Sequence, residues 1–397
     1  MRRLVALLAL LAACKSPPTE PSPRAAEEAR ALWVSRFEYG SPSDIDSIVA
    51  RAARTNFNVI FFQVRGAGDA FYVSDLEPCA VALCGSLGNG RPAWDPLAVA
   101  VAAAHARGIQ LHAWLNALSG WSAGSSTSCS LLQPSAPGSP AHMLVEHPEW
   151  RVVNTLGATQ SCPDAPNEYL YVSPGIPAVR THLARVAADV ARRYAVDGIH
   201  LDRIRYPGTS WSYDTTSLRI FGKDPVAFAA EWAQFRRDQV ALAVRETLDS
   251  VRAARPGVVL SAAVWGIWQD RWGWGSSHGY GQYFQDPRAW VANGWLDVAV
   301  PMTYYAINST PCGFADWACL LEDHLAMQTG ATARHVYIGI SASRGVAQVL
   351  QQIELGRQRG VRGFAIYSYS TLTAELRAAL AGGPFAEPAR VPNMPWL

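Results

Sequence analysis

Residues 196–207 read VDGIHLDRIRYP, and this stretch decides the fold. Two apolar residues alternate with His200 and Asp202, so the two polar side chains share one face of a short buried strand. Pro207 cannot continue a strand ladder because it lacks a backbone N–H group. In a parallel α/β barrel, an acidic residue at the carboxyl end of a strand points into the active site. The stretch therefore predicts a barrel strand that carries Asp202 to a site. The alternative is that Asp202 caps a loop or pairs with a neighbouring arginine.

Strand and helix signals alternate along the rest of the chain, a pattern typical of a parallel sheet wrapped by helices. Strands are predicted at residues 31–37, 58–64, 110–115, 258–265, 297–304, 336–341 and 363–369, and the stretch at 196–207 supplies the fourth strand of the eight. Helices are predicted at 43–55, 95–107, 179–194, 225–254, 317–329, 346–359 and 372–380, with a long loop-rich insertion at 118–172. The predicted fold class is therefore α/β, as a single (β/α)8 TIM barrel with loop insertions.

The first residues have the form of a bacterial lipoprotein signal. Arg2 and Arg3 precede an apolar run at residues 4–13, which is too short to span a bilayer. The run ends at Cys14, which we expect to be acylated and to become the mature N-terminus. An ordinary secretory signal with a chance cysteine is the alternative. Residues 1–13 are thus predicted to be a signal peptide and residues 14–30, which are rich in proline, a tether.

The barrel and its proline-rich C-terminal tail are expected to fill residues 31–397. The predicted location is the bacterial cell envelope, where lipid on Cys14 supplies the contact with the membrane. Lys15 follows the cysteine where an aspartate would favour retention in the inner membrane, so the outer membrane is expected in a double-membraned bacterium. The sequence leaves the oligomeric state open.

Composition excludes some classes of partner and favours a carbohydrate. The net charge is +2, and the chain has no basic tract, phosphate loop or zinc-finger spacing, so nothing suggests nucleic acid. No organic cofactor or metal site is implied. Fifteen tryptophans and fourteen tyrosines fit either a large core or a cleft in which sugars stack on aromatic rings. Trp265, Trp268, Trp272 and Trp274 crowd just beyond one predicted strand, which favours the cleft.

Six cysteines remain once Cys14 is set aside, and an even number in an exported chain suggests disulfides. Fifteen pairings are possible, and metal binding is a further alternative. Three local pairs are preferred because all six residues fall in predicted loops: Cys79 with Cys84, Cys129 with Cys162, and Cys312 with Cys319.

Polar and aromatic side chains end most of the predicted strands, and in a barrel they would converge. We call this set of strand-end side chains the cup. Aromatic rings and amides in the cup suit a neutral, hydroxyl-rich ligand. The predicted substrate-binding residues are Gln63, Arg65, His112, Trp114, Asn116, His200, Trp265, Tyr304 and Tyr367. The arginine and the two histidines could equally be satisfied polar groups of the core.

Glycosidases usually need two carboxyl groups, one of which protonates the leaving oxygen. Asp202 is the first candidate. Glu38 and Asp69 lie at or just past strand ends and are candidates for the second group, although each could equally be structural. Asp270 and Glu168 lie on predicted loops and are weaker candidates.

These motifs together resemble the glycosyl-hydrolase-like 10 family of bacterial TIM-barrel proteins, over nearly all of residues 31–397. The matching segments are RALWV at 30–34, NVIFFQVR at 58–65, GDAFY at 68–72, HAWLN at 112–116, the stretch at 196–207, PMTYY at 301–305 and GFAIYSY at 363–369. The resemblance implies an exported glycosidase that acts on peptidoglycan strands stripped of their peptides, with its strand-four carboxylate at Asp202. Many members of the family carry a second acid directly after it, where this chain has Arg203.

A fainter similarity connects the chain to chitinase-type barrels, in which the substrate's N-acetyl group acts as the nucleophile. Ile204 occupies the position of their catalytic acid, so their mechanism does not transfer directly. Assistance by an acetamide that Asp202 and Tyr304 orient remains open. The sequence thus predicts a lipid-anchored glycoside hydrolase acting on an N-acetylhexosamine glycan. The alternative is a non-catalytic carbohydrate-binding lipoprotein built on the same barrel.

Overall fold

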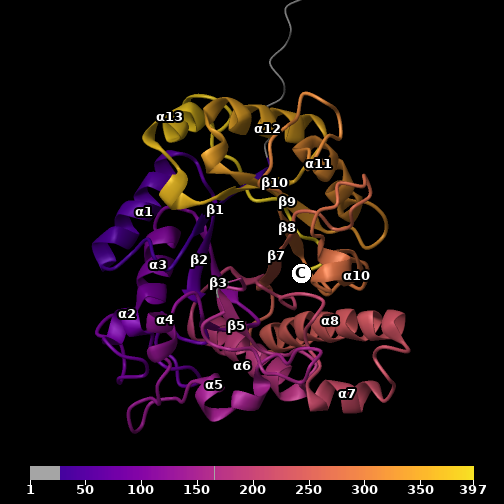
Figure 1. Ribbon diagram of the computed structural model, residues 1–397. Coiled ribbons are helices and arrows are strands. Elements are labelled where there is room, and N and C mark those ends of the chain that lie inside the picture. Colours follow the sequence, from indigo (N-terminus) through magenta and orange to yellow (C-terminus); the bar gives the residue numbers. More distant parts are fainter. Residues whose placement is uncertain (1–26, 165) are drawn as a thin grey trace, which may run out of the picture.

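The computed structural model describes residues 27–164 and 166–397 and shows a closed parallel barrel. Neighbouring strands follow the order β1-β10-β9-β8-β7-β6-β3-β2 (Figure 1). The barrel strands are β1 (Ala29–Val34), β2 (Val59–Arg65), β3 (Gln110–Asn116), β6 (Gly198–Asp202), β7 (Val259–Trp265), β8 (Val298–Met302), β9 (His335–Ser341) and β10 (Gly363–Tyr367). All eight predicted strands are present, and the (β/α)8 prediction is confirmed. Cys14 and the signal sequence around it lie outside the described residues.

Helices surround the barrel, as Figure 1 shows, and the major ones match the predicted spans. They are α1 (Pro42–Arg54), α3 (Pro96–His105), α6 (Pro177–Arg193), α8 (Ala229–Ala254), α11 (Trp317–Leu325), α12 (Val346–Gln358) and α13 (Ala374–Gly382). Ser41 and Asp95 begin α1 and α3 as side-chain caps, and a proline follows each cap. Shorter helices lie in the loops: α2 (Val81–Cys84), α4 (Ser126–Ser130), α5 (Met143–Glu146), α7 (Thr215–Phe221), α9 (Gly279–Gln282) and α10 (Pro287–Ala292).

Side chains alternate between two cores along each strand, as barrel geometry requires. One core fills the barrel interior and includes Trp33, Phe61, Trp114 and Tyr337. The larger core lies between the strands and the surrounding helices. The interior is therefore packed, and a ligand can approach only at an end of the barrel.

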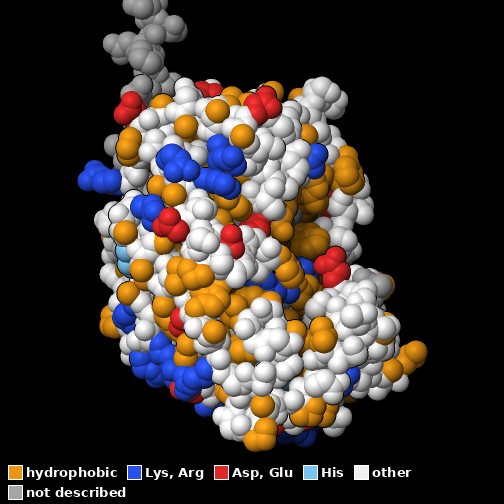
Figure 2. All heavy atoms as spheres, turned by 90° about the vertical axis from the view of Figure 1, so that its left-hand side faces the viewer, with side chains coloured by type: hydrophobic (Ala, Val, Ile, Leu, Met, Phe, Trp, Pro, Cys, Tyr) orange, Lys and Arg blue, Asp and Glu red, His pale blue; other side chains and the backbone are white. Residues whose placement is uncertain are grey.

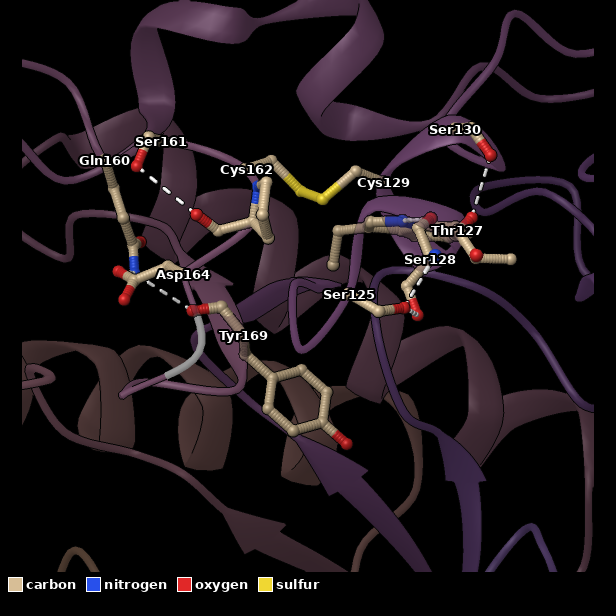
Figure 3. Close-up of a disulfide and its surroundings, with 12 residues drawn as sticks. Ser125, Thr127, Ser128, Cys129, Ser130, Gln160, Ser161, Cys162, Asp164 and Tyr169 are labelled. Atoms are coloured by element: carbon tan, nitrogen blue, oxygen red, sulfur yellow. Dashed lines mark hydrogen bonds between the residues drawn. A yellow bond between two sulfur atoms is a disulfide. The ribbon is translucent and has the colours of Figure 1, made fainter.

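The predicted insertion between β3 and α6 contains an antiparallel pair of strands that the sequence did not indicate. They are β4 (Ser119–Ser122) and β5 (Tyr169–Tyr171). The Cys129–Cys162 disulfide joins the end of α4 to the segment before β5, and Tyr169 lies beside this segment (Figure 3). Disulfides also link Cys79 to Cys84 and Cys312 to Cys319, so all three preferred pairings are confirmed.

The C-terminal tail closes the amino end of the barrel, which we call the base. Val391 and Met394 pack against the interior core, and the indole N–H of Trp396 donates to a carboxylate oxygen of Asp297 at 3.0 Å. The backbone N–H of Glu28 donates to the carbonyl of Arg390 at 2.8 Å. The first and last described segments therefore lie together at the base, and the cup must open at the other end.

Within residues 27–164 and 166–397, no helix has the length and apolar character needed to cross a bilayer.

Candidate active site

Asp202 ends β6 and lies in register with Asn116 at the end of β3. The backbone N–H of Arg203 donates to Asp202 Oδ1 at 2.5 Å, and Arg205 Nη1 lies 3.7 Å from the same oxygen. Arg203 adopts a left-handed conformation with φ of 49°, where the chain turns away from the strand. The side chain of Asp202 is 15% exposed. Asp202 is thus a partly accessible carboxylate that lies near the charges of Arg203 and Arg205 and accepts one backbone N–H group.

Two tyrosine rings lie near enough to Asp202 to interact with its charge: Tyr304, which follows β8, and Tyr367, which ends β10. Tyr304 and Tyr367 stack with ring centroids 5.0 Å apart, and both contact Trp33 edge-on. Burial raises the pKa of Tyr304 well above its usual value, and Tyr367 and Asp202 raise it further. Burial, then Asp202 and Glu38, likewise raise the pKa of Tyr367. Both hydroxyls therefore keep their protons, and neither forms a hydrogen bond within the described chain, so both can donate to a ligand.

His200 lies beneath the cup. It is fully buried, accepts a hydrogen bond at Nε2 from the indole N–H of Trp33 at 3.0 Å, and has Ser261 Oγ 2.9 Å from Nδ1. Because Nε2 is the acceptor, the proton must lie on Nδ1. Burial, and then His112, hold the pKa of His200 well below its usual value, so the ring is neutral. The structure thus makes His200 part of the floor and leaves it no free atom for a ligand.

His112 lies one layer deeper, towards the base. Its strand position pairs with Gly198, where a Cβ atom would meet the imidazole ring at 2.4 Å. Burial lowers the pKa of His112 to about 4. Its place in the packed interior favours the core alternative over direct binding of substrate.

A network of amides forms one wall of the cup. Asn116 Oδ1 accepts from Gln63 Nε2 and from the indole N–H of Trp114, each at 3.2 Å. Asn116 Nδ2 donates to the Gly66 carbonyl at 2.9 Å, and Gln63 Oε1 accepts from the Arg36 N–H at 3.2 Å. Because these groups hold one another in place, the wall is rigid, and the three predicted residues shape the cup.

Arg65 points away from the cup, which corrects the expectation that it binds substrate. The register between β2 and β3 shifts between Gln63 and Arg65, so Arg65 pairs with Leu115, a residue of the outer core. Such a bulge turns the side chain that follows it to the other face of the sheet. Arg65 there forms a fully buried ion pair with Glu77 at 2.7 Å and also donates to the carbonyl of Asn116. Its guanidinium supports the wall from behind.

The two candidates for a second carboxyl group differ in position. Glu38 accepts from the N–H of Ser35 at 2.6 Å and from the N–H of Ser370 at 2.7 Å, so it joins the loops that follow β1 and β10. It lies near enough to Tyr367 to raise the pKa of that residue. Asp69 is buried and accepts from the N–H of Ala67 at 2.9 Å within the loop after β2. Glu38 is therefore the better placed of the two.

Aromatic side chains line the rim on the β7 side. Trp265 packs on Tyr283 with ring centroids 4.2 Å apart. Trp272 and Trp274 stack at 4.4 Å, and the indole N–H of Trp274 donates to the carbonyl of Cys312 at 3.2 Å, which ties the loops after β7 and β8 together. Asp270 accepts backbone N–H groups of this same loop and is structural there. Figure 2 shows a hollow near its right edge, where hydrophobic side chains are flanked by charged ones.

Sequence reasoning missed several cup residues. The two tyrosines of β5 reach the cup edge: Tyr169 OH accepts from Arg36 Nη2 and Tyr171 OH accepts from Arg203 Nη1, each at 3.1 Å. Arg203 directly follows β6 and Arg36 lies two residues past the end of β1, so proximity to a strand end was a usable signal for them. No local signal marked the tyrosines, because their position depends on the β4–β5 pairing and on the fold of the insertion.

Known proteins resemble this chain in sequence and in fold. The family described as "Glycosyl hydrolase-like 10" matches residues 28–354. The chain is 24% identical to glycosyl hydrolase YngK of Bacillus subtilis, over 93% of this chain and 74% of that protein. It is 27% identical to glycosyl hydrolase DigH of Escherichia coli K12, over 85% of this chain and 81% of that protein. The glycoside hydrolase domain of PgaB (BpsB) from Bordetella bronchiseptica shares the fold, with a TM-score of 0.64 and 13% identity over 89% of this chain and 98% of that domain.

Proposed function

The chain belongs to the Glycosyl hydrolase-like 10 family, and from this premise we propose that it hydrolyses an N-acetylhexosamine-containing glycan, namely peptide-free peptidoglycan strands. One observation carries the proposal: a partly exposed carboxylate at a barrel strand end faces two neutral tyrosine hydroxyls that have no partner in the described chain. A carboxylate and donors in this arrangement suit a sugar ring, whose hydroxyl and acetamide groups need both kinds of partner. The two curated relatives are named as glycosyl hydrolases, which supports the reaction class.

In this proposal Asp202 is the catalytic residue, and two routes are compatible with the cup. In the first, Glu38 supplies the second carboxyl group across the site, as two-acid glycosidases require. In the second, the substrate's own acetamide oxygen attacks the anomeric carbon, and the bond from that carbon to the leaving oxygen breaks. Asp202 accepts from the acetamide N–H and orients it, Glu38 gives a proton to the leaving oxygen, and Tyr304 donates a hydrogen bond to the negative charge that develops there. Water then opens the cyclic intermediate and completes the hydrolysis. The second route needs no protein nucleophile, and Arg203 directly after Asp202 is compatible with it.

A binding protein without catalysis is the second candidate, and one observation favours it. Asp202 already has Arg203 N–H and Arg205 as neighbours, and both oxygens of Glu38 accept backbone N–H groups. Carboxylates held in this way can be structural.

For either function we propose that lipid on Cys14 holds the protein in the cell envelope. The mass of the mature N-terminal peptide tests this part of the proposal.

Product release from peptide-free strands and from chitooligosaccharides, followed by mass spectrometry, tests the proposed activity. The detergent-solubilised full chain is compared with Asp202→Asn and with Asp46→Asn, the same change at an exposed position of α1. Loss of a catalytic carboxyl group typically lowers the rate by about 10²- to 10⁴-fold, so we expect that loss for Asp202→Asn and none for Asp46→Asn. Cleavage by Asp202→Asn within tenfold of the parent rate would remove Asp202 from the mechanism. Binding of strands without cleavage by the parent would favour the binding protein.

A further inference from the structure

Arg205 is an unusual group to find beside a candidate catalytic carboxylate. The residue is 8% exposed, yet its guanidinium forms no hydrogen bond with any described residue, and Nη1 is buried without a partner. Its nearest charge is Asp202 at 3.7 Å, beyond hydrogen-bond distance. The rings of Trp265 and Tyr283 flank it at 5.2 and 6.0 Å. A buried donor that stays unpaired costs about 1–3 kcal/mol, so this guanidinium is poised to receive an acceptor.

Two further arginines lie at the same edge of the cup. Arg203 lies over the ring of Tyr169 at 4.3 Å and donates to Tyr171 OH, and its carboxylate partner Glu168 is 69% exposed at 3.3 Å. Arg36 donates to Tyr169 OH through Nη2, and its Nη1 is buried without a partner. The β5 tyrosines thus hold two guanidinium groups that have no buried carboxylate partner within residues 27–164 and 166–397.

Together these groups form what we call the arginine wall: Arg36, Arg203 and Arg205. A guanidinium fork matches the two oxygens of a carboxylate, and such charge-assisted pairs are roughly twice as strong as neutral hydrogen bonds. The wall therefore differs from the neutral, hydroxyl-rich lining that the sequence suggested. It suits a sugar that carries an acid group.

We propose that the arginine wall, with Arg205 as its main contact, recognises a carboxylate on the glycan, namely the free acid of the lactyl ether on an N-acetylhexosamine. The inference rests on the proposed function and adds the substrate group that the arginine wall binds, a carboxylate. In a peptide-free strand this acid is ionised, whereas an attached peptide converts it to a neutral amide that is also much larger. Discrimination between these two forms would therefore follow from charge and size at one position, beside the proposed catalytic residue Asp202.

Three substrates of equal length test the proposal: peptide-free strands, the same strands with their lactyl acids coupled to methylamine, and chitooligosaccharides. A charge-assisted hydrogen bond contributes about 1.5–3 kcal/mol, which corresponds to about 10- to 100-fold in kcat/KM. We expect the parent to prefer the acidic strands by that factor over both neutral substrates. Arg205→Gln should bring the ratio close to one, and Arg203→Gln, at a more exposed position, should lower it less. Arg245→Gln on the exposed face of α8 is the matched control and should keep the parent ratio.

The outcomes separate this inference from the proposed function. If the parent cleaves acidic and neutral glycans equally well, or if folded Arg205→Gln and Arg203→Gln both keep the parent ratio, the arginine wall does not read a carboxylate, although the protein remains a glycosidase. If the parent cleaves none of them but binds acidic strands more tightly at low salt, and Arg205→Gln weakens that binding at least tenfold, the inference stands and the hydrolase proposal falls.

Discussion

The Arg65–Glu77 ion pair makes a quantitative prediction about how the cup is supported. Both side chains are 1% exposed. His182 Nε2 also lies 3.1 Å from a carboxylate oxygen of Glu77. The change Glu77→Gln removes the negative charge but keeps the shape of the side chain. It leaves the Arg65 guanidinium buried without a full counter-charge, and breaking a buried pair from one side costs about 3–5 kcal/mol.

The pKa of Glu77 gives an independent estimate of the same quantity. Burial alone would raise it, but the charges of Arg65 and His182 outweigh burial and lower the pKa from 4.5 to about 2. At about 1.4 kcal/mol per pH unit, this lowering corresponds to about 3 kcal/mol of stability. Because the pKa is lower in the folded state, the contribution is complete above pH 4.5 and is lost as the pH falls from 4.5 towards 2.

Urea unfolding followed by circular dichroism at pH 7 and at pH 3 measures this contribution. We expect Glu77→Gln to lower the free energy of unfolding by about 3–5 kcal/mol at pH 7, and by less at pH 3. The matched control is Glu322→Gln, which breaks a half-exposed pair with Arg359 and should cost about 0–1 kcal/mol. If Glu77→Gln behaves like the control, the buried pair contributes no more than a surface pair, and the reasoning that Arg65 needs Glu77 as its counter-charge is refuted.

Three further predictions concern other parts of the chain. Tyr304→Phe and Tyr367→Phe should each lower kcat by about 100- to 1,000-fold on peptide-free strands, the range expected for a lost transition-state donor, with melting temperatures close to that of the parent. Unchanged kcat would remove the donor role. Removal of Cys129–Cys162, which spans 33 residues, should cost about 4 kcal/mol by chain entropy, against about 2 kcal/mol for Cys79–Cys84, which spans 5; paired Cys→Ser variants in urea unfolding rank the two, and the opposite order would contradict the entropic account. Trp396→Phe removes a hydrogen bond to Asp297 at the base and should cost about 1–3 kcal/mol without changing KM, so a changed KM would show that the base and the cup are coupled.

The alternation of residue types in the sequence predicted the barrel, because successive side chains of each strand must point into two different cores. The same alternation placed Asp202, Asn116 and Tyr304 at strand ends, where the structure finds them. It failed at Arg65 because a single bulge shifts the alternation by one residue, and nothing in NVIFFQVR marks a bulge. It also assigned His200 to the cup, since periodicity gives the face of a residue but not its depth in the barrel.

The arginine wall could be predicted only in part. Arg203 and Arg205 lie in the motif that first drew attention to Asp202, and their proximity to the cup follows from the motif. The part played by Tyr169 and Tyr171 could not be predicted, because these residues reach the wall through a β4–β5 pair whose strands are too short to show a period. The local cysteine pairs were predictable from spacing and loop position, but the tertiary contacts that they support were not.

The first and last described segments lie together at the base of the barrel, opposite the mouth. Glu27 forms a parallel bridge with Arg390 there, so the polypeptide enters the barrel on the side opposite to the mouth. With a lipid at Cys14, as proposed, the base of the barrel would face the bilayer and the cup would open away from it. The proposed hydrolysis would then be restricted to glycan strands within reach of the tether from the membrane surface. Both the anchor and the chemistry of the cup would thus determine which strands are cleaved.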